Sequence, residues 1–356
     1  MDPIAFDASC LVNERSTGVE RSFLITLEAF TKLPDMPPCV VYRPAQSRTE
    51  LPPGVEIREI PRLPLSLWRS TLLPRALHEE NAAALLSPTT ALPRLAPCPR
   101  IATVHELPGG YAGAREHAFE ELRHERAIDG LPQRADRVLV PSEHTRRDLL
   151  RRSPVLAPRT RVQPQPLHPY FLEPYPAVPF SARRGLLFVG QSRRRKNLPR
   201  ILHAWEQLPE ALRLEHPLFW VGGAIDAGGQ KGLASGIELL PELDQTEIVH
   251  RMSLVRGLLL PSLSEGFGIP ALEALAVGTP VLGSKGSVTE ELCGELSTLV
   301  DPYDVHAILI AMEELLRSPA AWERSSASGP ELAAKYTPAL SAEHWRSVLE
   351  ELGVMG

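Results

Sequence analysis

Residues 258–291 read LLLPSLSEGFGIPALEALAVGTPVLGSKGSVTEE, and this stretch decides the fold class. The apolar run 258–260 indicates a buried strand, and the turn after it is rich in glycine and serine. Pro270 suits the first position of a helix, which Gly278 would end, and a second strand is expected at 280–283. A strand, a helix and a strand in this order form one unit of a parallel sheet.

The turn before this helix is a candidate anion site. Ile269, which precedes Pro270, has no side-chain acceptor, so we expect the first N–H groups of the helix to lack a side-chain cap. Such N–H groups, next to the turn 266–268 and supported by the helix dipole, can bind an anion. Glu265 and Glu273 flank this turn and could both reach one ligand. Acidic residues at a helix N-terminus are also a common structural feature, so this pattern alone leaves both interpretations open.

Similar apolar, β-branched runs recur along the chain with helical stretches between them. Near-continuous apolar strands that alternate with helices are typical of parallel sheets covered on both faces. The sequence therefore predicts an α/β fold. Besides 258–260 and 280–282, strands are expected at 40–42, 101–104, 138–140, 186–189 and 218–221.

Proline marks the predicted domain boundary. The chain contains 36 prolines, and six of them lie within 162–184, where neither a helix nor a central strand can persist. We therefore expect two α/β domains, 1–170 and 171–335, followed by a C-terminal helix in 336–356 that could pack back on the first domain. A cleft between the two domains would be the ligand site, because parallel sheets bind ligands beyond the carboxyl ends of their strands.

A second candidate site follows the predicted strand 186–189. Residues 190–197 read GQSRRRKN and place four cations beside a glycine at the carboxyl end of a strand. This arrangement suits a diphosphate, and Lys196 is one of only five lysines among the 38 basic residues. A solvated basic run is the alternative interpretation.

The first half of the chain adds two further candidates. Gly18 opens a helix after the apolar start 4–6, where a residue without a side chain could let the backbone approach a ligand. His105 ends the segment 101–105, which places it at the edge of the predicted sheet where ligands bind. A single histidine at such a position is more often structural than functional.

Composition and spacing exclude several function classes. The formal charge of −5 argues against a nucleic-acid binder, although the arginine-rich run 134–161 could face phosphates or an anionic membrane, or be a solvated helix face. His117, Glu121 and His124 share one helical face, but a polar surface explains them better than a metal site. The four cysteines have no metal-binding or disulfide spacing. We therefore expect no bound metal.

Motifs for other cofactor-dependent reactions do not occur. The sequence has no dinucleotide-binding, P-loop or serine-hydrolase motif, so no cofactor is expected. No apolar run approaches the length of a membrane span, and Asp2 stands where a signal peptide would carry positive charge. These features predict a cytoplasmic protein.

Residues 261–274, PSLSEGFGIPALEA, resemble the E-x7-E motif of the retaining glycosyltransferases of family 4, especially of their bacterial mannosyltransferase-like branch. The resemblance implies the GT-B fold, in which two Rossmann-like parallel-sheet domains face an interdomain cleft. The first domain would bind the acceptor and the second the nucleotide sugar. Shorter matches support it at 17–19, 104–106, 140–143, 188–190, 195–197, 278–281, Glu291 and Gly294.

The resemblance also implies residue roles. Glu265 would hold the donor sugar, Glu273 the ribose, and His105 would face the reacting sugar. Arg195 and Lys196 would neutralise the diphosphate in place of a metal ion. The catalytic candidates are thus Glu265, His105, Lys196 and Arg195, and the other donor-binding candidates are Gly18, Gly190, Asn197, Gly266, Phe267, Gly268, Ile269 and Glu273.

The predicted activity is metal-independent, retaining hexosyl transfer from a nucleoside-diphosphate sugar to an acceptor hydroxyl, in polysaccharide or glycolipid assembly. The branch resemblance favours mannosyl transfer from GDP-mannose, ahead of UDP-hexoses and dTDP-rhamnose. Two alternatives remain: a non-catalytic nucleotide-sugar-binding partner subunit, and a GT-B nucleotide-sugar epimerase.

The expected acceptor is a saccharide or a lipid-linked saccharide. A leucine-rich stretch with Arg62, Trp68, Arg69 and Arg75 could dock a lipid-linked saccharide at the inner face of a membrane. The same stretch could equally form a core helix with basic edges.

Overall fold

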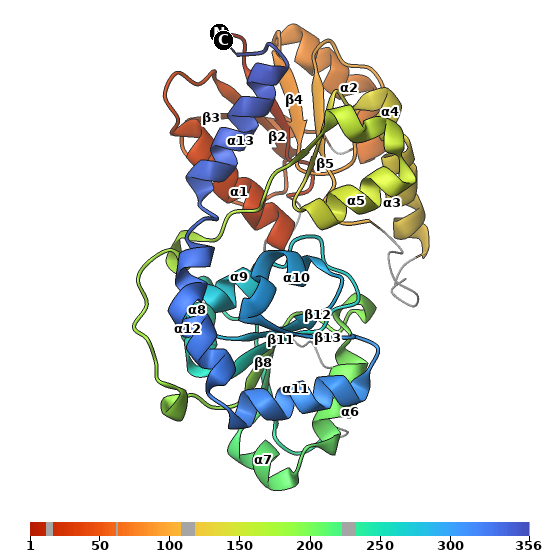
Figure 1. Cartoon of the computed structure of the whole chain (residues 1–356). Helices are drawn as coiled ribbons and strands as arrows, with labels where there is room; N and C mark the ends of the chain where they lie inside the picture. Colours follow the sequence, from red (N-terminus) through yellow and green to blue (C-terminus); the bar gives the residue numbers. More distant parts are fainter. Residues whose placement is uncertain (12–16, 62, 108–117, 223–232, 356) are drawn as a thin grey trace. The chain divides into compact units, whose positions relative to one another are not determined.

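The structure is a computed structural model of the chain, and it describes residues 1–11, 17–61, 63–107, 118–222 and 233–355. The chain divides into two compact units. The first unit comprises the described residues up to Pro166 together with those from Thr337 onward, and the second unit comprises those of Leu167–Tyr336. Each unit is a parallel sheet with helices on both faces (Figure 1).

The first unit contains a seven-stranded sheet in the order β3-β2-β1-β4-β5-β6-β7, and neighbouring strands are all parallel. Its strands are β1 (Ile4–Asp7), β2 (Cys39–Pro44), β3 (Val55–Ile60), β4 (Ala84–Ser87), β5 (Arg100–Thr103), β6 (Arg137–Val140) and β7 (Thr160–Val162). Its helices are α1 (Gly18–Thr31), α2 (Leu65–Glu79), α3 (Ala118–Asp129), α4 (Leu131–Arg134), α5 (Glu143–Arg152), a 3-10 helix (Pro154–Arg159) and α13 (Pro338–Glu351).

Alternate residues of β1 bury themselves against different helices, as the period of a strand requires. Ile4 and Phe6 belong to the core under α1 and α13, while Ala5 belongs to the core under α2. Trp345 of α13 completes the first of these cores, because its ring centroid lies 5.5 Å from that of Phe6 and 5.6 Å from that of Phe30. The last helix of the chain is therefore part of the first unit.

The second unit contains a six-stranded parallel sheet in the order β10-β9-β8-β11-β12-β13. Its strands are β8 (Leu186–Val189), β9 (Leu218–Val221), β10 (Ile237–Leu240), β11 (Gly257–Leu260), β12 (Val281–Ser284) and β13 (Ser297–Val300). Its helices are α6 (Leu198–Gln207), α7 (Glu210–Glu215), α8 (Gln245–Leu254), α9 (Ile269–Ala276), α10 (Val288–Cys293), α11 (Val305–Arg317) and α12 (Ala320–Ala333), with 3-10 helices at Pro169–Phe171, Phe180–Ala182, Arg194–Lys196 and Gly294–Leu296.

Both faces of this second sheet are buried. Leu258 and Leu260 face the core that includes α8, α9 and α10, whereas Leu259 between them faces the core under α6 and α11. A central strand with apolar neighbours on both sides needs an uninterrupted apolar run, which explains the Leu-Leu-Leu sequence of β11.

The predicted α/β class with two parallel sheets is confirmed. Each predicted strand coincides with an observed one, although Val104 follows β5 and Pro280 precedes β12. The prediction for the start of α9 was wrong by one residue: Gly268 is the residue before the helix, and Ile269 is its first residue. Proline is accommodated at the second position because N–H groups of the first turn need no partner within the helix.

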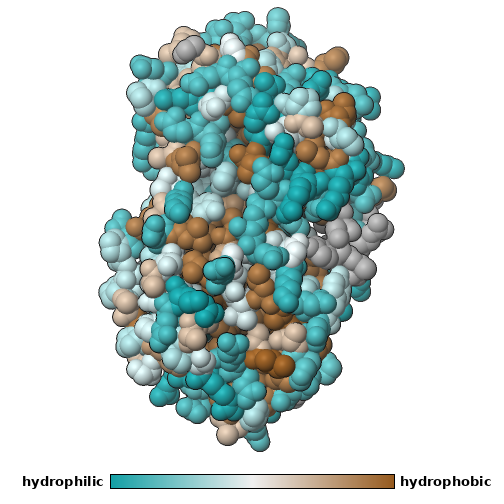
Figure 2. Space-filling model, in the orientation of Figure 1, coloured by the Kyte–Doolittle hydropathy of each residue, from teal (hydrophilic) through white to brown (hydrophobic). Residues whose placement is uncertain are grey.

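Ion pairs occupy most arginines of the run 134–161. On the face shown in Figure 2, hydrophobic side chains lie in scattered groups among hydrophilic ones. Of the eight arginines in 134–161, five form ion pairs with carboxylates, which supports the interpretation of this run as a solvated face. These pairs are Arg137–Glu351, Arg146–Glu143, Arg151–Asp148, Arg152–Asp129 and Arg161–Glu351.

The leucine-rich stretch around α2 is partly internal. Trp68 is buried, Arg69 Nε lies 2.8 Å from Asp7 Oδ2, and Arg75 pairs with Glu79; Arg62 lies outside the described residues. These contacts agree with a core helix that has basic edges. Over the part of the chain that the structure describes, no helix is both long and apolar enough to span a bilayer.

Candidate active site

The loop between β11 and α9 presents backbone at the carboxyl end of a central strand. Gly268 has φ +86° and ψ 39°, a left-handed conformation that favours glycine. Its position before Ile269 supplies no side-chain hydrogen bond to the start of α9, as the sequence predicted. The first N–H groups of α9 therefore begin the helix without a side-chain acceptor of their own.

Residues 190–197, which we call the basic turn, lie at the end of the neighbouring strand, β8. Gly190 has φ +136°, and its carbonyl accepts a hydrogen bond from the indole Nε1 of Trp220 at 2.9 Å. A Cβ added at Gly190 would lie 3.7 Å from Cε of Lys196. That distance is an ordinary van der Waals contact, so the backbone conformation at Gly190, rather than space for Lys196, favours glycine here.

Two hydrogen bonds hold the basic turn against the glutamate loop, residues 261–268, and a third holds the turn against the segment that follows β13. The backbone N–H of Leu263 donates to the carbonyl of Arg195 at 2.7 Å. The Nδ2 atom of Asn197 donates to the carbonyls of Pro261 and Pro302, at 2.9 and 2.6 Å. Asn197 is buried and adopts a left-handed conformation with φ 60°. Its side chain therefore positions the loop, because both amide hydrogens are already used.

Glu265 lies at the centre of this arrangement. Its Oε1 atom is 2.6 Å from Lys196 Nζ and accepts a hydrogen bond from Ser262 Oγ at 2.8 Å. Its Oε2 atom is 3.2 Å from Nη1 of Arg195. The side chains of Glu265 and Lys196 are 8% and 11% exposed, so this cluster is shielded from water and holds one more positive than negative charge.

Two opposing effects set the pKa of Glu265. Burial raises it, but the positive charges of Lys196 and Arg195 and the hydrogen bonds from Lys196 and Ser262 outweigh burial and hold the pKa below its usual value. Glu265 is therefore a carboxylate at neutral pH, able to accept hydrogen bonds from hydroxyl groups.

The other predicted residues of the glutamate loop have mixed placements. Phe267 is buried, and its ring packs against that of Tyr336 with centroids 5.7 Å apart; only its backbone could contact a ligand. Glu273 is buried and is the fifth residue of α9, not a residue of the first turn as its sequence position suggested. Its side chain lies within the fold rather than on the surface.

Gly18 is the first residue of α1. A capping box closes the start of this helix, since Thr17 Oγ1 accepts from the N–H of Glu20 and the Glu20 carboxylate accepts from the N–H of Thr17. A Cβ added at Gly18 would meet no atom within 4 Å. The structure of this unit therefore shows no close packing that requires glycine there.

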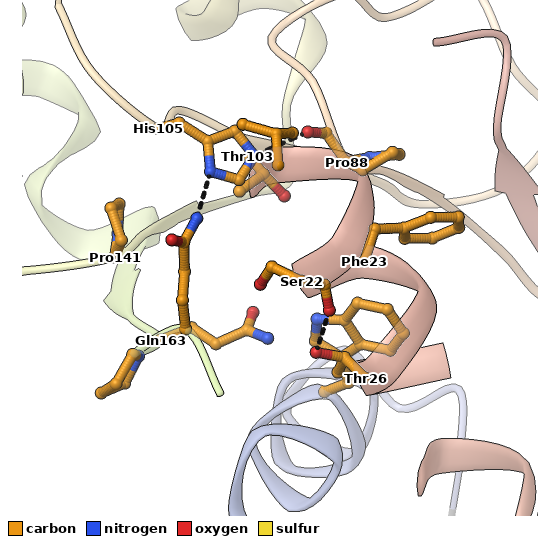
Figure 3. Close-up of a pocket in the computed structure, with 12 residues that line it drawn as sticks. Ser22, Phe23, Thr26, Pro88, Thr103, His105, Pro141 and Gln163 are labelled. Carbon is orange, nitrogen blue, oxygen red and sulfur yellow. Dashed lines mark hydrogen bonds between the residues drawn. The ribbon is translucent and has the colours of Figure 1, made fainter. Parts of the chain in front are cut away.

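His105 lies two residues beyond β5, and both of its ring nitrogens are hydrogen-bonded (Figure 3). Nε2 is 2.8 Å from the carbonyl oxygen of Pro88, which can only accept, so Nε2 carries the proton. Nδ1 is 2.9 Å from Nε2 of Gln165, whose N–H donates to it. This arrangement requires a neutral ring. The pKa of His105 is lowered to about 4, chiefly by burial and also by the charge of His124, against the opposing effect of the Pro88 hydrogen bond.

The structure brings only part of the predicted set together: Gly18 and His105 both lie in the first unit, but the hydrogen bonds of the His105 ring are to other residues. Gly190, Arg195, Lys196, Asn197 and Glu265 form one group in the second unit. Sequence reasoning missed Ser262, although it lies inside the quoted motif, and it missed Gln165, the partner of His105. Among the described residues, no group of three or more His, Cys, Asp or Glu side chains is placed to hold a metal ion; His117 lies outside them.

Two family models match the chain and together cover most of it. The model for Glycosyltransferase Family 4 matches residues 17–170, and the model for Glycosyl transferases group 1 matches residues 179–331. The chain belongs to the family 4 glycosyltransferases. The resemblance indicated by the motif at 261–274 is therefore confirmed.

Among curated relatives, the glycosyltransferase is similar to O-antigen chain mannosyltransferase B of Escherichia coli, with 29% identity over 150 residues, 40% of this chain and 39% of that protein. The matched region thus spans less than half of the relative's length. Two solved structures share the fold. Sucrose-phosphate synthase from Thermosynechococcus elongatus has a TM-score of 0.79 at 19% identity and 99% coverage of both chains. HepE from Anabaena, solved with UDP-glucose, has a TM-score of 0.73 at 14% identity, with 99% of this chain and 100% of that chain covered.

Proposed function

We propose that this glycosyltransferase takes a nucleoside-diphosphate hexose as donor, retains the configuration at the anomeric carbon and requires no metal ion. The observation that carries the proposal is the cluster of Glu265, Lys196 and Arg195, which lies at the carboxyl ends of β8 and β11. Two cations beside helix N–H groups suit a diphosphate. A low-pKa carboxylate between them suits the hydroxyls of the attached sugar.

The proposed transfer is balanced as follows. The bond between the anomeric carbon and the diphosphate oxygen breaks, and the nucleoside diphosphate leaves with the bonding electrons. A bond forms between the anomeric carbon and the acceptor oxygen on the same face of the sugar, and the acceptor proton passes to the departing diphosphate. Lys196 and Arg195 stabilise the negative charge that develops on that diphosphate, a contribution that a metal ion makes in other enzymes.

The cations are held by Glu265 before a donor binds. A diphosphate that reaches Lys196 and Arg195 shares them with this carboxylate. Its negative charge lowers the net charge of the cluster from positive to negative, unless the sugar carries compensating positive charge. An oxocarbenium-like transition state does carry such a charge. Glu265 would thus stabilise the reacting sugar more in the transition state than in the ground state, which is what accelerates a reaction.

For the finer assignments, GDP-mannose is our proposed donor and a saccharide or lipid-linked saccharide our proposed acceptor. The similarity to the O-antigen chain mannosyltransferase of Escherichia coli supports the mannosyl group, and the solved complex of HepE with UDP-glucose supports a nucleotide-sugar ligand. Glu273 would bind the ribose, and Gly18, Gly190, Asn197 and the backbone of 266–269 would line or support the donor site. A cytoplasmic location at the inner face of a membrane belongs to the same proposal.

The donor can be tested without knowledge of the acceptor. In a thermal-shift screen of GDP, UDP and dTDP, we expect GDP to raise the melting temperature most, since a ligand at a hundred times its Kd stabilises by about 2.7 kcal/mol. Lys196→Met should abolish this shift, whereas Lys32→Met, at the exposed residue that follows α1, should not. Equal shifts for all three nucleotides would contradict the proposed preference for GDP, and no shift with Lys196 intact would contradict the nucleotide site itself.

The reaction itself is tested with the selected nucleotide sugar. Nucleoside diphosphate should appear stoichiometrically with glycosylated product when an acceptor is supplied, and proton NMR should show the donor's anomeric configuration in the product. Activity should persist in EDTA. An inverted product would overturn the retaining assignment, and loss of activity in EDTA that is restored by Mg²⁺ or Mn²⁺ would overturn the metal-independent one.

A further inference from the structure

A cavity of about 30 Å³ lies in the first unit beside His105. Its wall contains the segments that follow β4, β5, β6 and β7, one side of α1, and Trp345 of α13 (Figure 3). The carboxyl ends of four adjacent parallel strands therefore meet here, and this edge of an α/β sheet is where ligands bind. The space is large enough for about one water molecule or one hydroxyl group.

The chemistry of the wall selects a neutral polar group. No Asp, Glu, Lys or Arg is among the described residues that line the cavity. A phosphate would find no cation in this wall, and a metal ion would find no carboxylate. The polar groups that do line the cavity include the hydroxyl of Ser22 and the carboxamides of Gln163 and Gln165.

Gln163 supplies an acceptor without a partner. Its Nε2 atom donates to Oγ of Ser341 at 3.2 Å, which fixes the orientation of the amide. Its Oε1 atom is buried and makes no hydrogen bond. In Figure 3 the side chains of Gln163 and Ser22 point toward one another across the cavity. A buried acceptor without a donor is unfavourable, and a donor that enters this space would relieve the cost.

His105 does not offer this donor or acceptor itself. Its Nε2–H is held by Pro88 and its Nδ1 by Gln165, so a ligand could reach a ring nitrogen only by displacing one of these groups. The free hydrogen-bonding groups of the cavity include Oε1 of Gln163 and the hydroxyl of Ser22.

We propose that this cavity is a subsite for one hydroxyl group of a saccharide substrate. The hydroxyl hydrogen is donated to Oε1 of Gln163, and the hydroxyl oxygen accepts from Oγ of Ser22. Phe23 and Trp345, which also line the cavity, provide aromatic surface for the adjacent C–H groups. The inference rests on the proposed function only in taking the ligand to be a saccharide. That hydroxyl can belong to the donor hexose or to the acceptor.

A cycle of protein and substrate changes tests the subsite. The protein variants are Ser22→Ala and Gln163→Met, with Ser70→Ala on the exposed side of α2 as the control. The donor arm measures hydrolysis of GDP-mannose and its monodeoxy analogues without an acceptor. The acceptor arm measures transfer to methyl α-mannoside and its monodeoxy analogues.

We expect one analogue to lose about tenfold in kcat/KM with the unaltered protein and with Ser70→Ala, because the buried groups are left unpaired. Ser22→Ala and Gln163→Met should lower kcat/KM for the parent sugar by a similar factor and lose nothing further with that analogue. The arm in which this coupling appears identifies the sugar. Strictly additive losses for every analogue in both arms would overturn the subsite and leave the cavity to a structural water.

Failure of the proposed function gives a different result. If the unaltered protein turns over no nucleotide sugar, that function is wrong, but saturation-transfer NMR with the same sugars still tests the subsite. Contact with the sugar ring that is lost in both Ser22→Ala and Gln163→Met, while both variants keep the melting temperature of the control, would support the subsite. Contact that is absent, or unchanged in both variants, would overturn it.

Discussion

Among single residues, Glu265 has the most specific electrostatic environment, because its carboxylate is the counter-ion of both Lys196 and Arg195. In the unaltered protein a bound diphosphate must share the two cations with the Glu265 carboxylate. Glu265→Gln removes that competing negative charge. We therefore expect nucleoside-diphosphate affinity, measured by calorimetry, to stay the same or to increase. The rate constant kcat should fall by about a hundredfold, since the transition state loses its stabilising carboxylate.

The control for this variant is Glu313→Gln, which removes an exposed carboxylate from α11. It should leave both nucleotide affinity and kcat unchanged. A Glu265→Gln protein that loses diphosphate affinity in proportion to kcat would show that Glu265 organises the nucleotide site rather than the reacting sugar.

His105 makes the stability of the first unit depend on pH. Its pKa is lowered from 6.5 to about 4, so between these values the unfolded chain binds a proton that the folded unit does not. Stability must therefore fall as pH decreases through this window. His105→Gln should make the melting temperature fall less between pH 6.5 and pH 4. The corresponding change in unfolding free energy is at most about 3 kcal/mol.

The comparison is made between variants, because burial also lowers the pKa of His124, His216 and His344. These groups give the unaltered protein a similar slope, which His105→Gln should reduce but not remove. Identical pH profiles for the two proteins would mean that the His105 ring is not held neutral by Pro88 and Gln165.

At the scale of residues, proximity could be predicted from the sequence where polar residues follow strand ends. Lys196 and Glu265 are 69 positions apart, yet each follows an apolar run, and their strands β8 and β11 are neighbours in the sheet. Gln165 follows β7, the short strand at the sheet edge, and meets His105 from a position 60 residues away. The sequence around Gln165 gives no sign of that contact, because a glutamine in a proline-rich loop is common and has no motif around it.

At the scale of elements, the start of α9 depends on one backbone conformation. Gly268→Ala would place a Cβ at φ +86°, which costs about 1–2 kcal/mol for an L-residue. Its neighbours lie at 3.7 Å or more, so strain rather than collision sets the effect. We expect a lower melting temperature and weaker nucleotide binding, because the N–H groups at the start of α9 are displaced.

Gly54→Ala is the matched control for this change. Gly54 has the same φ of +86° and nothing within 4 Å, but it precedes β3 in the first unit. It should lower stability by a similar amount and leave nucleotide binding intact. Equal loss of binding in both variants would attribute the effect to general destabilisation.

Four of the strands that the sequence did not predict share a position in the fold. β3, β7, β10 and β13 are the edge strands of the two sheets, and each is only partly buried. An edge strand faces solvent on one side and so carries polar residues, as in Val-Glu-Ile-Arg-Glu-Ile of β3. The continuous apolar run that identifies central strands is therefore missing.

Two other strands escaped prediction for different reasons. β4 is central and apolar, but it follows an alanine-rich stretch that is equally compatible with a helix. β1 was noted only as an apolar start, because four residues at the beginning of a chain have no preceding element to frame them. The local sequence does not show that these segments are strands. Their pairing shows it, since β1 lies between β2 and β4 in the sheet.

At the scale of the whole molecule, the two units are not two consecutive segments of the chain. The first unit takes its last helix, α13, from beyond the second unit in sequence. Tyr336 and Leu167 lie at the two crossing points, where the N–H of Leu167 donates to the carbonyl of Tyr336 at 2.9 Å. Folding of the first unit therefore remains incomplete until the end of the chain is available.

Trp345 tests this dependence most directly. Its ring packs against Phe6, Phe23 and Phe30, so Trp345→Ala leaves a cavity in the core of the first unit and should cost about 3–5 kcal/mol. Hydrogen exchange should speed up in β1 and β4 but not in β11 and β12, since the second unit has its own cores. Leu340→Ala, at an exposed position of the same helix, should change neither. Uniform loss of protection in both units would contradict this, because it would mean that they unfold as one cooperative body and that α13 stabilises the whole chain rather than the unit it completes.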